Sequence, residues 1–222
     1  MSIETVLLVL ESVLLFFTIL LLLYSIREGR HRDRLLVEVG RATRILTREE
    51  YFLTVSDAML DAEREVIGSI TGRRPSADDD KRVRTIVGHI EKLRGQGGTV
   101  RYLVPRFPDR LHVGARYRQA GAEIRYSSSL IQDIRYLVVD RRLVVIGIPE
   151  SAGDQQATRK GYGIPSEGLA AMLEESFEHA WETATGHEAY VREMLRETGA
   201  SPKLLARELH VDPAELERLA AG

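Results

Sequence analysis

No cysteine occurs among the 222 residues of the chain. This absence excludes a disulfide framework, a thiolate metal site and a cysteine nucleophile. An excess of either charge is missing too, because 31 Lys and Arg face 33 Asp and Glu. Without a global basic field, the composition argues against nucleic acid as a partner. We also expect neither a metal ion nor a cofactor.

The first 26 residues contain no Lys or Arg. Within them, residues 6–26 form an apolar run that matches the roughly 20 residues needed to cross a hydrocarbon core of about 30 Å. A cleaved signal peptide is the competing interpretation, but it would carry a basic start and a small-residue cleavage site. The run therefore predicts an uncleaved transmembrane anchor over residues 1–30.

Charges beside the run predict its orientation. Arg27, Arg30, Arg32 and Arg34 follow it, whereas Glu4 is the charge that precedes it. Basic flanks stay in the cytoplasm. We therefore expect a single-pass membrane protein with its N-terminus outside and its C-terminal domain in the cytoplasm.

Glu11 lies inside the apolar run, where a carboxyl group is costly and usually faces a bundle interior or a cavity. One interpretation is a protonated or snorkelling side chain near the interface. The other is a ring of Glu11 side chains that lines a polar path through an oligomer.

Residues 31–50 are predicted to form a juxtamembrane helix, because small and apolar residues recur at spacings of three and four. Thr47 and Glu50 have the spacing of a capping box, so a new helix is predicted to begin near Thr47. The helix is either a plain connector or a dimer stalk that relays state between membrane and cytosol.

From about residue 51, helical and strand patterns alternate, which predicts an α/β domain. Residues 131–150 form its centre: two Val-, Ile- and Leu-rich runs flank a polar turn at Asp140, Arg141 and Arg142. This predicts a β-hairpin. Because both runs are almost continuously apolar, the strands are expected in the middle of a sheet, buried on both faces.

The hairpin resembles the signature of the phospholipase D superfamily, His-x-Lys-x4-Asp followed by Gly-Ser-x-Asn. Asp140 and Gly147 keep the family residue. At the His position stands Asp133, at the Lys position Arg135, and at the Asn position Glu150. The order of elements over residues 51–184 is similar to one phospholipase D-like α-β-α half-domain.

The resemblance implies a half-unit that pairs with a second copy, as a homodimer or a higher homo-oligomer. It also implies lost catalysis, because Asp133 replaces the histidine nucleophile and sets a negative charge against an anionic substrate. Candidate residues for ligand binding or a dimer seam are Asp133, Arg135, Asp140, Glu150, Arg159 and Lys160. The alternative for the first four is a structural set of ion pairs, and the alternative for Arg159 and Lys160 is a solvated surface.

Residues 185–222 are predicted to form a helical tail that resembles a helix-turn-helix, with Ser201 as an N-cap before Pro202. Ala206 and Val211 occupy its packing positions. The second helix carries Glu215, Glu217 and one Arg, whereas a DNA-reading helix presents basic or amide side chains. We therefore interpret the tail as an interaction module.

Three functions follow from these patterns. The first is a membrane-anchored, non-catalytic cytosolic module that senses a small-molecule ligand or scaffolds a protein partner as an oligomer. The second is a membrane-bound phosphodiesterase or phospholipase with altered catalytic residues. The third is a ligand-gated membrane effector whose anchors open a leak around Glu11.

Overall fold

The computed structural model describes residues 14–21, 24–25, 44–73, 77–129, 134–148, 160–209 and 213–221. The chain divides into two units, Met1–Ala42 and Thr43–Gly222, each of which is described by itself.

In the first unit, residues 14–21 and 24–25 are helical. Both stretches fall inside the predicted membrane span. Within the described ranges, none of the helices combines the length and the apolar character that crossing a bilayer requires. The rest of the span, including Glu11, lies outside the described residues.

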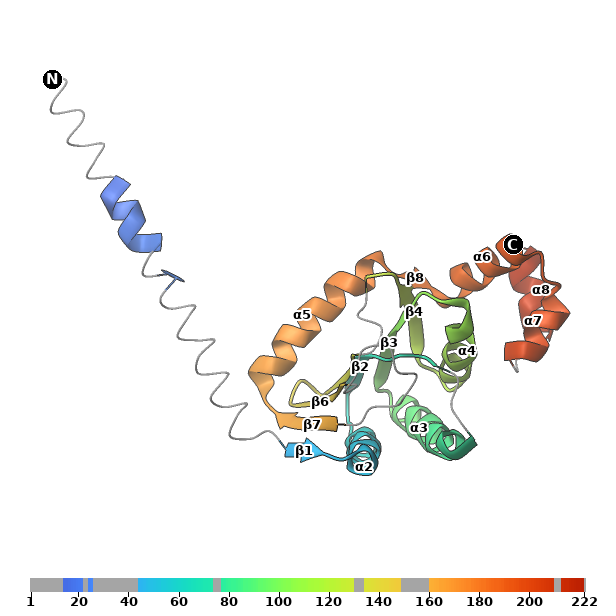
Figure 1. Cartoon of the computed structure of the whole chain (residues 1–222), viewed down its shortest axis with the longest axis horizontal. Coiled ribbons are helices and arrows are strands. Elements are labelled where there is room, and N and C mark those ends of the chain that lie inside the picture. The colour runs from blue at the N-terminus through green and yellow to red at the C-terminus, as the bar shows by residue number, and fades with distance from the viewer. Residues whose placement is uncertain are drawn as a thin grey trace, which may run out of the picture. The chain divides into compact units, whose positions relative to one another are not determined.

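The second unit is a mixed α/β domain, which confirms the predicted class (Figure 1). Its strands are β1 (Arg44–Leu46), β2 (Glu65–Ser69), β3 (Thr99–Pro105), β4 (Glu123–Ser127), β5 (Arg135–Val139), β6 (Leu143–Ile148), β7 (Lys160–Pro165) and β8 (Thr185–Gly186). Its helices are α2 (Arg48–Leu60), α3 (Ala77–Gly95), the 3-10 helix η1 (Pro108–Arg110), α4 (Leu111–Gln119), α5 (Glu167–Thr183), α6 (His187–Thr198), α7 (Pro202–Leu209) and α8 (Pro213–Ala221).

The strands form one sheet in the order β1-β7-β6-β5-β2-β3-β4-β8. Strands β2, β3 and β4 are parallel neighbours, joined through α3 and α4, and the remaining pairs are antiparallel. The predicted hairpin is confirmed as β5 and β6, and it lies in the interior of the sheet with β7 on one side and β2 on the other. This position explains why both of its strands are apolar on both faces.

Helices α2, α3 and α4 cover one face of the sheet, and α5 covers the other (Figure 1). Alternation along β3 shows the two environments. Tyr102 belongs to the core beneath α2, α3 and α4, whereas the guanidinium of the preceding Arg101 lies 5.3 Å from the ring of Phe177 in α5. Successive side chains of a strand point to opposite faces.

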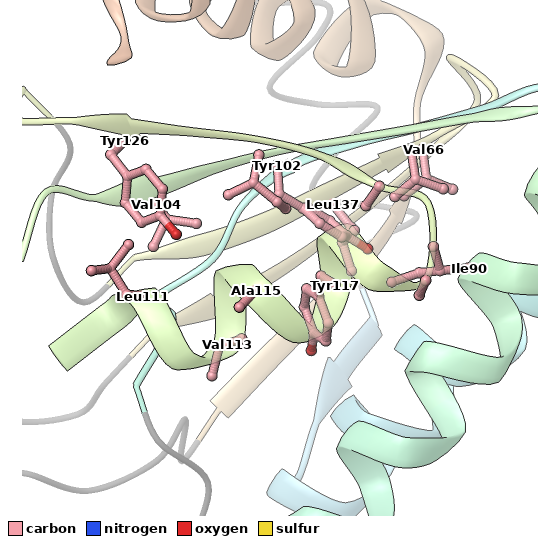
Figure 2. Packing of buried hydrophobic residues seen from close by; sticks show 14 of the residues in the cluster. Val66, Ile90, Tyr102, Val104, Leu111, Val113, Ala115, Tyr117, Tyr126 and Leu137 are labelled. Atoms are coloured by element: carbon pink, nitrogen blue, oxygen red, sulfur yellow. The ribbon is translucent and has the colours of Figure 1, made fainter. Parts of the chain in front are cut away.

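Figure 2 shows the core between the sheet and helices α3 and α4. Tyr102 and Tyr117 lie in contact there, with ring centroids 5.5 Å apart, beside Ile90 of α3 and Leu137 of β5. Burying side chains of this size stabilises the fold by about 1.5–3 kcal/mol each. This core fixes the strands that carry the candidate site.

The capping box is confirmed at the start of α2. The backbone N–H of Glu50 donates to Thr47 Oγ1 (3.3 Å), and the backbone N–H of Thr47 donates to Glu50 Oε2 (2.8 Å). Two of the backbone donors that a helix start leaves unsatisfied thus find acceptors.

The predicted juxtamembrane helix is wrong for Arg44–Leu46, which form β1 instead. Strand β1 pairs with β7, with Ile45 opposite Tyr162, and the Leu46 side chain is buried. Leu46, which the helical spacing placed on the apolar side of the predicted helix, is instead buried by packing against the sheet. Tertiary packing outweighs the local helical pattern here. The remaining described part of residues 31–50 is the start of α2.

The tail is continuous with the domain, although the sequence predicted a boundary at residue 184. Strand β8 pairs with β4, and the ring of Tyr190 in α6 lies 4.6 Å from that of Tyr126 in β4. Helices α7 and α8 pack on α4 and α6. Ser201 caps α7 through the backbone N–H of Leu204 (3.2 Å), and Ala206 is buried, as predicted. Val211 lies outside the described residues.

Candidate functional site

The turn of the β5–β6 hairpin is tight. Asp140 and Arg141 have φ values of 48° and 59°, and the backbone N–H of Arg142 donates to the carbonyl of Val139 (3.0 Å). Two consecutive residues with positive φ define the type I′ turn, whose twist matches that of the flanking strands. Aspartate tolerates this conformation better than most residues.

The Asp140 carboxylate is buried, with 3% of the residue exposed, and it binds the connection between α2 and β2. The backbone N–H of Glu63 donates to Oδ2, and those of Arg64 and Glu65 donate to Oδ1, each at 2.9 Å. The Arg142 guanidinium adds a bond of 3.3 Å to Oδ2. Asp140 therefore closes a connection some 75 residues away in sequence.

Burial by itself would raise the pKa of Asp140. Hydrogen bonds from the backbone amides of Glu65, Glu63 and Arg64 and from the Arg142 side chain more than offset it, so the pKa lies below its ordinary value. The group is an ionised carboxylate whose acceptor positions are taken by the protein. These bonds make Asp140 a structural residue that holds the α2–β2 connection, and we call this contact the latch. Its role at a ligand site or a dimer seam stays a prediction.

Arg135 begins β5 at the opposite, open end of the hairpin, paired with Gly147. Asp140 follows Arg135 by five positions, so their Cα atoms are about 17 Å apart at the usual rise of a strand. Two of the candidate residues, Arg135 and Asp140, thus lie at opposite ends of the hairpin. Ser69 at the end of β2 lies opposite Tyr136, which puts Arg135 at the carboxyl ends of the parallel strands. Open α/β sheets bind ligands at that edge.

The Arg135 guanidinium has a buried nitrogen, Nε, with no hydrogen-bond partner among the described residues. It lies on the face of α2, α3 and α4, because Arg135, Leu137 and Val139 alternate along β5 and the last two belong to that core. A buried N–H without an acceptor costs about 1–3 kcal/mol. Such a group in a folded protein points to a missing partner, such as a ligand, an ion or a water molecule.

Two tyrosines of the core are close enough to Arg135 for its charge to affect their pKa values. Burial raises the pKa of Tyr51 and of Tyr117 to about 12, and the positive charge of Arg135 offsets part of each rise. Tyr51 packs against β7 at Gly161, where an added Cβ would lie 2.5 Å from its ring. Glycine is therefore required at this position. The raised pKa values keep both tyrosine hydroxyl groups protonated at neutral pH. Nothing in the single sequence distinguished Tyr51 and Tyr117 from core residues.

The other predicted site residues are only partly described. Asp133, Glu150 and Arg159 lie outside the described residues. Lys160 begins β7, paired with Ile148, and its side chain is not among those described. Their roles stay predictions. In the described part of the chain, no group of His, Cys, Asp or Glu side chains is placed to hold a metal ion.

No protein-family model matches the chain, and no curated protein matches it. Among solved structures, it is similar to Nuc, a phospholipase D family member from Salmonella typhimurium (14% identity, TM-score 0.48, 65% of this chain and 96% of that one). NucT from Helicobacter pylori (9%, 0.48, 65% and 98%) and TrmBL2, an archaeal chromatin protein (15%, 0.49, 80% and 70%), are also similar. At these values the likeness extends at most to the arrangement of helices and strands.

Proposed function

We propose that the chain is a membrane-anchored, non-catalytic sensing module on a phospholipase D-like half-domain. Its α/β domain binds a small anionic ligand at the open end of the β5–β6 hairpin. Arg135 is the residue that recognises the ligand, and Tyr51 and Tyr117 contribute hydroxyl groups beside it.

The buried Nε of Arg135, which has no acceptor among the described residues, is the observation that carries the proposal. Arginine presents several N–H donors in a fixed plane, which suits carboxylate and phosphate oxygens. A ligand oxygen at Nε would remove the free-energy cost of the unsatisfied donor. Part of the binding free energy is therefore the relief of this cost, which the protein bears when no ligand is bound.

Sensing is favoured over catalysis by the residue types of the hairpin. In the family that the hairpin resembles, a histidine attacks phosphorus, and that position holds Asp133 here. A carboxylate there is poorly suited to the histidine's role, which needs a nucleophile that can also leave. Arg135 keeps a positive charge at the family's lysine position, so anion binding survives the loss of the nucleophile.

The tether is part of the same proposal. The apolar residues 6–26 anchor the chain as a single-pass protein, and the four following arginines keep Thr43–Gly222 in the cytoplasm. Confining copies to one membrane plane raises their effective concentration, which favours a homodimer or a larger homo-oligomer. A half-unit that pairs with itself would then report ligand binding through its assembly state.

The test is a panel of soluble anions, including nucleotides, sugar phosphates and dicarboxylates, added to the full chain in phosphatidylcholine nanodiscs. Thermal unfolding is the measurement. A ligand at 100 times its Kd stabilises the protein that binds it by about 2.7 kcal/mol, which raises the unfolding temperature by several degrees. We expect Arg135→Gln to abolish the rise.

Arg141→Gln is the matched control, because Arg141 belongs to the same hairpin but has an exposed side chain paired with Glu174. It should keep the ligand response. A panel without any response in the parent chain, or a response that survives Arg135→Gln, would contradict the proposal. If the parent chain hydrolyses a phosphodiester and Asp133→Ala abolishes this activity, the protein is an enzyme and the sensing proposal is wrong.

A further inference from the structure

A second group of positive side chains lies far from the hairpin, around a groove of about 400 Å³. The groove is bordered by the end of α4, the first residues of β4 and the start of α6. Three arginines from these three elements line it, Arg118, Arg125 and Arg192. Their convergence is not explained by the proposed ligand site, which is at the opposite end of the parallel strands.

Contacts hold two of the three guanidinium groups in place. Arg125 lies over the ring of Trp181 at 4.6 Å, and its Nη1 donates to the Trp181 carbonyl at 2.9 Å. Arg118 pairs with Glu188. A guanidinium carries five N–H donors, and the bond to the Trp181 carbonyl takes one of those of Arg125. Pre-oriented donors bind with a smaller loss of conformational entropy than free ones.

His187 adds a neutral donor to the groove. Only 7% of the residue is exposed, and its Nδ1 lies 2.9 Å from the hydroxyl of Tyr126. Burial raises the pKa of Tyr126, so its hydroxyl stays protonated and can donate to Nδ1. Burial, with a smaller effect of Arg118, lowers the pKa of His187 to about 4. The ring is then neutral, and when the Tyr126 hydroxyl donates to Nδ1 the ring proton lies on Nε2, the edge opposite Tyr126.

Nε2 of His187 has no hydrogen-bond partner among the described residues, and His187 lines the groove. The same residue opens α6, whose N-cap is Gly186 and whose first turn has no side-chain cap. Backbone N–H groups of a helix start favour an anion. Donors from α4, β4 and α6 thus meet at one groove: the guanidiniums of Arg118 and Arg125, and from α6 a third arginine, a buried imidazole and the amides of its first turn.

We propose that this groove binds a phosphoryl group, and that the side chains of Arg118, Arg125, Arg192 and His187 donate hydrogen bonds to it. Two carboxylates, Glu123 and Glu188, also line the groove. They offset two of the three positive charges, so a monoanion gains little there. A phosphate or pyrophosphate group carries more charge and offers several oxygens to donors that arrive from different directions. The phosphoryl group can belong to a soluble molecule or to a lipid headgroup.

The probe is inorganic pyrophosphate, titrated calorimetrically into the full chain in phosphatidylcholine nanodiscs at constant ionic strength. Arg192→Gln should weaken binding at least tenfold. Arg196→Gln is the matched control, since Arg196 lies one turn further along α6 with its side chain exposed, and it should change the Kd less than twofold. Arg135→Gln should also leave the Kd unchanged, which separates this groove from the site at the hairpin.

Repeating the titration in nanodiscs that contain phosphatidic acid distinguishes the two sources. Unchanged pyrophosphate binding supports a soluble ligand. Loss of pyrophosphate binding, together with preferential recovery of the parent chain over Arg192→Gln on phosphatidic acid vesicles, supports a lipid headgroup. The proposal is overturned if the parent chain binds pyrophosphate in neither kind of nanodisc and does not prefer phosphatidic acid. It is equally overturned if Arg192→Gln binds like Arg196→Gln.

Discussion

At the turn of the β5–β6 hairpin a buried carboxylate has a protein partner for both oxygens, whereas at the open end a guanidinium keeps a buried nitrogen without an acceptor among the described residues. Asp140 and Arg135 are both charged side chains at the ends of a largely apolar strand. At Asp140 the protein supplies three backbone amides. At Arg135 the described residues provide no acceptor for Nε.

The difference separates the structural charge of Asp140 from the charge of Arg135, which we propose binds a ligand. A satisfied buried charge stabilises the fold, and removing it leaves orphaned donors behind. An unsatisfied one destabilises the fold and is expected where binding matters. Substitutions at the two ends should therefore change stability in opposite directions, although both remove one charged group.

The largest effect is expected for Asp140→Ala, which leaves the amides of Glu63, Arg64 and Glu65 without an acceptor. We expect the free energy of unfolding to fall by about 3 kcal/mol, measured by urea denaturation. Asp140→Asn keeps an oxygen for two of the amides and presents an N–H₂ group to the third, so its loss should be smaller. Equal, negligible losses in the two variants would show that the latch contributes nothing.

Acid sharpens the same point. The folded-state pKa of Asp140 is lowered below the ordinary 3.8, so its contribution to stability is complete above pH 3.8 and is lost as the pH falls through the lowered value. The difference in unfolding free energy between the parent chain and Asp140→Asn should therefore be constant from pH 6 to 5 and shrink below pH 3.8. A difference that grows on acidification would contradict this sign.

A change of opposite sign is expected at the open end. Arg135→Met keeps an unbranched stem that reaches about as far as Nε and removes the buried unsatisfied donor, so the free energy of unfolding without ligand should rise by about 1 kcal/mol. Arg141→Met, at an exposed position, should stay within about 0.5 kcal/mol of the parent chain. Destabilisation by Arg135→Met would mean that the guanidinium already has its partner inside the protein.

The smallest effect concerns the turn itself. Arg141 adopts a φ of 59°, which costs a residue with a side chain about 1–2 kcal/mol. Arg141→Gly removes this strain and completes the Asp-Gly sequence that type I′ turns prefer. It also breaks the exposed pair with Glu174, worth about 0–1 kcal/mol. We expect a net gain of about 0.5 kcal/mol in urea denaturation, and a clear loss would contradict the turn assignment.

Local signals predicted most of the architecture. The hairpin, the capping box at Thr47 and the Ser201 cap are each specified by residues within a few positions of one another, so sequence alone suffices for them. The interior position of β5 and β6 was also predictable, because strands buried on both faces are apolar throughout.

Contacts between distant segments were not predictable. Strand β1 is three residues long and depends on β7 for its pairing. The role of Asp140 depends on amides about 75 residues earlier, and a carboxylate in a turn looks the same whether it binds a ligand or a loop. The groove at His187 combines α4, β4 and α6, whose adjacency is a property of the whole sheet. In both cases the sequence identifies the residue type, but it does not identify the distant residues that the side chain contacts in the fold.

The central claim is that the acceptor of Arg135 Nε comes from outside the chain. A crystal structure of the protein purified from membranes with its bound small molecules tests it most directly. The account predicts a ligand oxygen about 2.7–2.9 Å from Nε, the distance of a charge-assisted hydrogen bond. A carboxylate of the chain itself in that place, such as Asp133 or Glu150, would contradict it and make the open end a structural ion pair.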